Sequence, residues 1–112
     1  MKRRVVVTGL GVVTSLSCQV DDLWKRLLVG ESGIHPLHCF STDEFQVKIG
    51  GDIYDWDTTG YLEPKEAKRL DRFSQFAIVA AIDAVRDSGL EFDKVDRERC
   101  GVILGSFFTP DI

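Results

Sequence analysis

Residues 62–90 read LEPKEAKRLDRFSQFAIVAAIDAVRDSGL, and this stretch decides the fold. We predict that it forms one long helix. Pro64 suits the first helical position because its missing N–H needs no partner there, and Glu66 lies near the positive end of the helix dipole. Gly89 can supply the left-handed residue that ends a helix. About 25 residues at a rise of 1.5 Å per residue make a rod of roughly 37 Å, the width of a whole domain.

The two halves of this predicted helix carry different side chains. The first half presents a basic stripe on one face, with the spacing i, i+3, i+4 and i+7: Lys65, Lys68, Arg69 and Arg72. Residues 76–82 are apolar around the whole helix, which is the pattern of a helix buried on every side. Small side chains in this half allow close backbone approach: Ala77, Ala80, Ala81 and Ala84. We therefore predict a central helix between layers, which the rest of this chain is too short to cover.

Composition excludes several classes of function. The chain is 44% apolar and 29% charged, as in a soluble globular protein, and its formal charge of −4 argues against general nucleic-acid binding. No apolar run approaches the roughly 18 residues of a membrane span, and the N-terminus lacks the pattern of a signal peptide. Its 3 cysteines show no CxxC spacing, which favours a reducing compartment. We expect a cytoplasmic protein that binds neither nucleic acid nor a membrane.

The remaining segments predict an α/β fold. Two β-branched runs, Val5–Thr8 and Gly101–Leu104, have the composition of strands buried on both faces. Residues 23–28 form an amphipathic helix that ends at Gly30, and residues 46–53 alternate like a half-exposed strand. This order predicts a mostly parallel sheet whose outer strands are missing, so the chain reads as the opening of a larger fold.

Aromatic and charged residues flank the predicted long helix. Tyr54, Trp56 and Tyr61 precede it in a polar connection, and we expect them to pack beneath it. Residues 91–99 are highly charged and predict a surface loop.

The glycines after the first predicted strand invite a nucleotide-binding interpretation. Gly9 and Gly11 give the first part of the dinucleotide fingerprint, but Thr14 stands where its third glycine is needed. The acidic residue expected about 20 residues later has only Glu31 as a loose candidate. We favour the alternative that these glycines permit a tight turn after a core strand.

A second local cluster invites a metal interpretation. His35, His38 and Cys39 lie within five residues of one another, but their spacing fits none of the usual ligand patterns. We therefore predict a loop with incidental histidines, with no metal site and no cofactor.

Several segments together resemble one family. RVVVTGLGVVTSLS, DLWKRLLVGESGI, the stretch from GGDIYDW to RDSGL, and CGVILGS are similar, in order and spacing, to the N-terminus of the β-ketoacyl-acyl-carrier-protein synthases. The resemblance is closest to the elongating, type II branch and covers residues 3–106. It implies the thiolase fold, in which a helix pair is buried between two sheets. It also implies decarboxylative Claisen condensation of acyl and malonyl thioesters in fatty acid biosynthesis.

The resemblance also implies partners. In similar synthases, basic residues that match Lys65, Lys68 and Arg69 dock an acidic acyl carrier protein, and we assign Arg72 to the same stripe. The full-length parent is expected to be a homodimer. An alternative is a non-catalytic chain-length-factor-like subunit of the same fold, and a small nucleotide-binding module is a third hypothesis.

The chain departs from the family pattern at its end. Phe107 and Phe108 stand where the family has a glycine-rich loop near the acyl pocket. The nucleophilic cysteine, the two histidines and the lysine of the family fall beyond the sequence, and Cys18, Cys39 and Cys100 do not fit the nucleophile's place. We therefore assign no catalytic residue and expect this 112-residue chain alone to be inactive.

Overall fold

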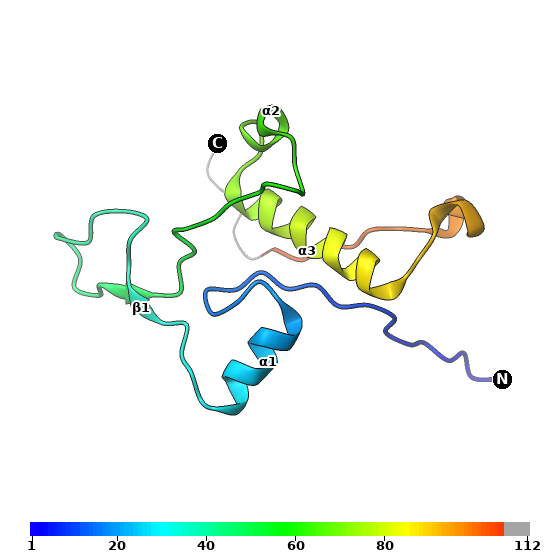
Figure 1. The fold of residues 1–112 in the computed structure, drawn as a ribbon, viewed down its shortest axis with the longest axis horizontal. Helices are drawn as coiled ribbons and strands as arrows, with labels where there is room; N and C mark the ends of the chain where they lie inside the picture. The colour runs from blue at the N-terminus through cyan, green and yellow to red at the C-terminus, as the bar shows by residue number, and fades with distance from the viewer. Residues whose placement is uncertain (107–112) are drawn as a thin grey trace.

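The structure is a computed structural model, and it describes residues 1–106 (Figure 1). Helix α1 spans Val20–Leu28, and the strands β1 (His35–Pro36) and β2 (Ile49–Gly50) follow. Helices α2 (Pro64–Ala67) and α3 (Arg72–Ser88) come next, and two 3₁₀ turns, Phe92–Lys94 and Arg97–Arg99, lead to the C-terminal segment. Among these described elements, none is a helix with the length and apolar character needed to cross a membrane.

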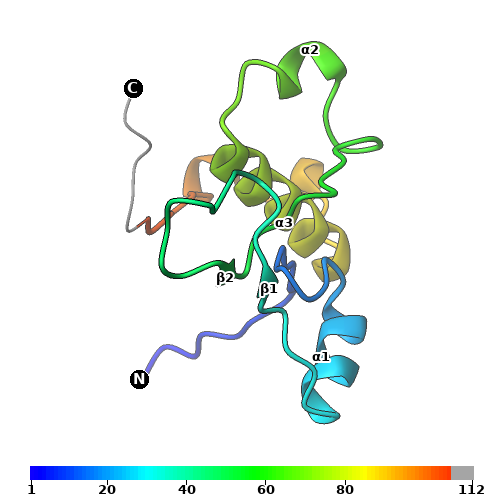
Figure 2. The same cartoon turned by 90° about the vertical axis from the view of Figure 1, so that its left-hand side faces the viewer.

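Helix α3 is the element against which the N-terminal segment packs (Figures 1 and 2). A Cβ atom added to Gly11 would lie 1.9 Å from the carbonyl oxygen of Ala80, and one added to Gly9 would lie 2.1 Å from that of Ala84. The Leu10 N–H donates to the Asp87 carboxylate at 2.9 Å. The predicted close approach at Ala80 and Ala84 is confirmed. The glycines serve this contact rather than a tight turn, since neither has a positive φ.

The prediction of one continuous helix is wrong, because the helix breaks between Lys68 and Asp71. Lys68, the C-cap of α2, still has helical backbone angles. Asp71 takes an extended conformation (φ −63°, ψ 155°) before α3 begins. Asp favours helix N-termini over helix interiors, and a continuous helix would hold four like charges on one face. Both effects favour a new start at Arg72.

Gln75 stabilises this break. Its amide Nε2 donates to the carbonyl oxygens of Ala67 (2.8 Å) and Leu70 (3.0 Å), and the Ala67 oxygen also accepts from the Leu70 N–H at 3.2 Å. Its Oε1 accepts a 2.8 Å hydrogen bond from the indole N–H of Trp56. The Trp56 ring packs edge-on against Phe76, with centroids 4.7 Å apart. The predicted packing of Trp56 beneath the helix is confirmed.

The other two aromatic predictions have different outcomes. The Tyr61 hydroxyl donates to Asp83 of α3 at 3.1 Å, so Tyr61 also packs on the helix. Tyr54 does not, because its ring lies 4.2 Å from the ring of His38. The predicted helix at residues 23–28 is confirmed as part of α1. The left-handed glycines that end α1 and α3 are also found, at Gly30 (φ 76°) and Gly89 (φ 66°).

The two predicted core strands are not buried strands in this structure. Val5–Thr8 and Gly101–Leu104 have no strand assignment, and Val5 and Ile103 are 93% and 98% exposed. A strand needs a neighbour for its N–H and C=O groups, and the described chain provides none at these segments. The sheet of the described residues is a two-stranded antiparallel ribbon, with His35 opposite Gly50 and Pro36 opposite Ile49, rather than a parallel sheet.

The prediction of a fully buried helix is also not met, because the fold is open. Among the described residues only Val79 is buried, at 2% exposure. The radius of gyration is 17.2 Å, whereas a compact domain of this length has about 13 Å. The accessible surface is 9986 Å², compared with about 6,200 Å² for a compact protein of this mass. The residues that form α3 lack the second layer that would cover them.

Substitution of Gly11 tests the contact that holds the N-terminal segment to α3. We expect Gly11→Val to push this segment away, because its Cβ would overlap the Ala80 carbonyl. The lost packing free energy is about 1–3 kcal/mol, which corresponds to roughly 5- to 150-fold faster amide exchange at residues 80–88. Gly101→Val is the matched control, since nothing lies within 4 Å of its added Cβ. Equal exchange rates in the two variants would contradict the packing described here.

Candidate functional site

Three basic side chains lie together at α2. Lys65 is in the helix, Lys68 is its C-cap, and Arg69 is in the turn that comes next, where its N–H bonds to the Glu66 carbonyl at 3.0 Å. All three are exposed. Beside them is a shallow hollow of about 290 Å³, lined by Leu62, Glu66, Arg69, Leu70 and Ile78. The arrangement offers positive charge next to a small apolar recess.

Arg72 does not belong to this surface. Its guanidinium donates to the carbonyl oxygen of Ile53 and lies 5.5 Å over the Phe76 ring. Its Nη1 is 3.8 Å from the Cys39 sulfur. The helix break between α2 and α3 turns Arg72 toward these groups. The four-residue stripe of the sequence prediction is therefore divided into an exposed group of three and one arginine engaged with the fold.

None of the three thiols has the environment of an activated nucleophile. The Asp52 carboxylate, which accepts a hydrogen bond from Cys39, raises the pKa of that thiol, and burial adds to the effect. A reactive cysteine needs the opposite, a lowered pKa. The Cys18 sulfur lies 4.0 Å from the Thr14 carbonyl oxygen, and that of Cys100 lies 3.5 Å from the Asp96 carbonyl oxygen. The sulfur of each cysteine thus lies near a backbone carbonyl oxygen.

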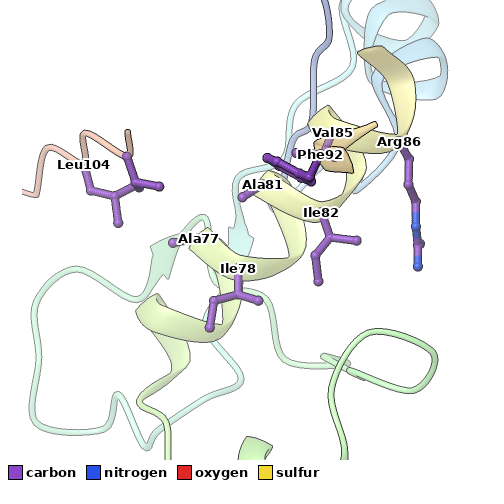
Figure 3. A pocket seen from close by; sticks show the side chains of 9 residues that line it. Ala77, Ile78, Ala81, Ile82, Val85, Arg86, Phe92 and Leu104 are labelled. Carbon is purple, nitrogen blue, oxygen red and sulfur yellow. The ribbon is translucent and has the colours of Figure 1, made fainter. Parts of the chain in front are cut away.

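An apolar hollow of about 520 Å³ runs along the outer face of α3 (Figure 3). Ala77, Ile78, Ala81, Ile82 and Val85 project from α3 to line it. Phe92 lies beside Val85, and Leu104 lies across from Ala77 on the C-terminal segment. Only Arg86, at the edge, adds charge. Such a surface can bind apolar side chains, but it carries no group for catalysis.

The sequence model described as "Beta-ketoacyl synthase, N-terminal domain" matches residues 2–111. The chain belongs to this family. It is 39% identical over 105 residues to 3-oxoacyl-[acyl-carrier-protein] synthase 2 of Synechocystis sp. and 43% identical over 105 residues to the protein of that name from Coxiella burnetii. It is 40% identical over 111 residues to the chloroplastic synthase II of Arabidopsis thaliana.

A solved structure has the same fold over most of the chain. It is described as the ishigamide ketosynthase/chain length factor and aligns with a TM-score of 0.76 at 32% identity. The alignment covers 85% of this chain and 24% of the other. The matches to the two curated bacterial relatives each cover 94% of this chain and 25% of the relative. The chain therefore spans about a quarter of the length of the relatives that it matches.

The structure places some of the predicted site residues of this chain and not others. Lys65, Lys68 and Arg69 are brought together and Arg72 is set apart, while Phe107 and Phe108 lie outside the described residues. Sequence reasoning missed the role of Asp52. Its carboxylate accepts hydrogen bonds from the backbone N–H groups of His38 and Cys39, which lie 14 and 13 residues earlier in the chain. A lone Asp after a two-residue strand gives no periodic signal, so spacing alone could not identify it.

Arg72 is expected to matter for local structure rather than for a surface charge. We predict that Arg72→Gln releases the Ile53 carbonyl and the Cys39 sulfur from α3 and lowers the midpoint of unfolding, since a hydrogen bond to a charged group is worth about 1.5–3 kcal/mol. Lys68→Gln removes the same charge from an exposed site and should change stability by less than about 0.5 kcal/mol. Urea titration followed by tryptophan fluorescence measures both. Equal effects of the two substitutions on stability would show that Arg72 is an exposed charge like Lys65, Lys68 and Arg69.

Proposed function

We propose that the chain is the N-terminal portion, residues 1–112, of a 3-oxoacyl-[acyl-carrier-protein] synthase that acts in fatty acid biosynthesis. The family match over residues 2–111 carries this proposal, and the names of the curated relatives support it. The parent condenses an enzyme-bound acyl group with the enolate formed when a malonyl thioester loses carbon dioxide. It works as a cytoplasmic homodimer, and its nucleophile comes from outside these 112 residues, so this chain alone is inactive.

The contribution of this chain to the reaction is to receive the carrier protein. Lys65, Lys68 and Arg69 present three positive charges on a chain whose net charge is −4. They lie at one end of the molecule, on α2, with α1 at the opposite end (Figure 2). A positive patch of this kind steers an acidic partner during diffusional encounter, and the effect falls as salt rises. Arg72 is not needed for this role because its guanidinium is engaged with Ile53.

Charge reversal in the full-length protein tests the docking surface. Lys65→Glu combined with Arg69→Glu should slow association with acyl carrier protein by at least about tenfold at low salt, because rim charges act mainly on the encounter rate. The loss should shrink as ionic strength rises. Stopped-flow association kinetics across a salt series measure this, and alkylation of the parent's reactive cysteine by a small reagent should stay unchanged.

The matched control is Lys25→Glu combined with Lys48→Glu. These two exposed lysines lie on α1 and just before β2, and the pair makes the same change in net charge. We expect the control to alter association by less than about threefold, through net charge alone. If both pairs slow association equally, the effect belongs to the overall charge, and α2 is not the docking surface.

A chain-length-factor-like subunit is the second candidate. The description of the structural neighbour, which names a ketosynthase and a chain length factor together, supports it. The two candidates differ in whether the parent carries a reactive cysteine. If one thiol of the parent takes up one acyl group from the carrier protein in the absence of malonyl thioester, the result favours the synthase. A parent that takes up no acyl group but assembles with a second subunit favours the alternative.

We also propose that the hollow along α3 is a packing surface of the larger fold rather than a ligand site. Its lining is almost wholly apolar, and it lies on the helix whose other side already receives the N-terminal segment. The relatives have about three-quarters of their length beyond the matched region, enough to supply a covering layer.

Ile78→Asp combined with Ile82→Asp tests this interpretation in two settings. In the isolated chain, the pair should lower the fluorescence of a bound hydrophobic dye severalfold, because each change removes an exposed apolar side chain from the hollow. In the full-length protein, the same pair should abolish soluble expression, since it buries two unpaired carboxylates. A soluble and active full-length double variant would show that the hollow remains open to solvent.

A further inference from the structure

Both histidines of the chain meet at one carboxylate. His35 lies in β1, His38 lies two residues beyond it, and Asp52 lies two residues beyond β2. One ring nitrogen of each histidine and one oxygen of Asp52 are all within 4.8 Å of one another. The antiparallel pairing of β1 with β2 brings these three side chains together. This cluster lies outside the docking surface, and its chemistry is independent of the proposed function.

Asp52 is held in place and has one oxygen to spare. Its Oδ2 accepts hydrogen bonds from the backbone N–H groups of His38 (2.8 Å) and Cys39 (2.9 Å). Its side chain is 11% exposed, and its buried Oδ1 has no hydrogen-bond partner among the described residues. Burial raises the pKa of this carboxyl, but the His38 and Cys39 amides, the Cys39 thiol and the charge of His35 together lower the pKa to about 2. A buried carboxylate oxygen without a hydrogen bond needs a proton donor or a positive partner.

The His35 ring faces the same point. Its Nε2 is 3.1 Å from the Asp52 carbonyl oxygen, and one tautomer of the neutral ring donates its single proton there. In the neutral ring the other nitrogen, Nδ1, then presents a lone pair 2.9 Å from the Pro36 carbonyl oxygen and 3.3 Å from Asp52 Oδ1. Three electron-rich atoms with no proton between them repel one another. Either a second proton on His35 or a metal cation removes this repulsion.

We propose that His35, His38 and Asp52 form a binding site for a divalent transition-metal cation of the Zn²⁺ class. Two imidazole nitrogens and one carboxylate oxygen are a known zinc ligand set that leaves one position for water. Imidazole ligands favour Zn²⁺, Co²⁺, Ni²⁺ and Cu²⁺ over Mg²⁺ and Ca²⁺. In the tautomer that carries its proton on Nε2, His35 donates to the Asp52 carbonyl, and a contact of this kind commonly orients a metal-binding histidine.

Access and geometry fit this occupant. His38 is exposed, so the cation can enter from solvent. Zinc bonds of about 2.0–2.2 Å require ligand atoms roughly 3.3–3.6 Å apart, so the cluster must contract by about an ångström. Rotation of the exposed His38 ring against Tyr54, which it already contacts at 4.2 Å between ring centroids, provides this movement. The bound cation would clip the loop after β1 to the segment after β2.

The third ligand of this site is not the residue that local spacing suggests. The sequence pairs the histidines with the adjacent Cys39, and that spacing matches no ligand pattern, which is why we predicted no metal site. The structure pairs them with Asp52, while the Cys39 sulfur lies 3.9 Å from the Ile53 carbonyl oxygen. The ligands here come from two segments that only the fold brings together.

Zinc binding to the 112-residue chain tests the proposal. Calorimetric titration with Zn²⁺ should show one equivalent bound. Because the chain has only these two histidines, nitrogen NMR of the imidazoles should show both shift on Zn²⁺ addition. His38→Ala and Asp52→Asn should each lower the affinity by about 10- to 100-fold or more. Mg²⁺ should give no response.

Three controls make the outcome decisive. Asp43→Asn removes a carboxylate from the same exposed loop and should leave the affinity unchanged. Cys39→Ser should also leave it unchanged, and a large loss would identify a thiolate site in place of this one. Concentrated urea should abolish binding, since the site depends on the fold. Absence of one-equivalent binding, or an Asp52→Asn variant that binds Zn²⁺ as tightly as the parent sequence, would overturn the proposal.

Discussion

The contact between the glycines of the N-terminal segment and the alanines of α3 is the constraint on which the rest of the structure depends. Two backbones approach so closely there that neither side has room for another carbon atom: Gly9 meets Ala84, and Gly11 meets Ala80. The Asp87 carboxylate adds a hydrogen bond to the Leu10 N–H between them. Because α3 holds the only residue buried among those described, Val79, this is the place where the chain comes nearest to a core.

Two further attachments to α3 position the other segments. Gln75 binds the carbonyl oxygens at the end of α2 and the indole of Trp56, so it fixes the angle at which the basic residues leave the helix. Arg72 holds the carbonyl oxygen of Ile53, whose neighbour Asp52 holds the amides of His38 and Cys39. The loop after β1 is therefore linked to α3 through residues 52–53, and Arg72 Nη1 also lies 3.8 Å from the Cys39 sulfur of that loop.

Sequence patterns predicted what depends on local chemistry. The left-handed glycines at positions 30 and 89, the amphipathic α1 and the small residues facing Gly9 and Gly11 all follow from backbone freedom and side-chain size. The break at Asp71 was within reach of the same reasoning, because an Asp within a run of like charges favours a helix start. The periodicity of the basic residues hid it, since their spacing fits one face whether or not the helix continues.

What could not be predicted depends on partners far away in sequence. Val5–Thr8 and Gly101–Leu104 have strand composition, yet a strand exists only where another backbone satisfies it, and the described chain offers none. The Asp52 cluster likewise arises from the register of β1 with β2, which sets His35 opposite Gly50. A register shifted by one residue would turn Asp52 to the other face of the ribbon, away from both imidazoles. Composition therefore shows which side chains can bind a cation, and pairing decides whether they meet.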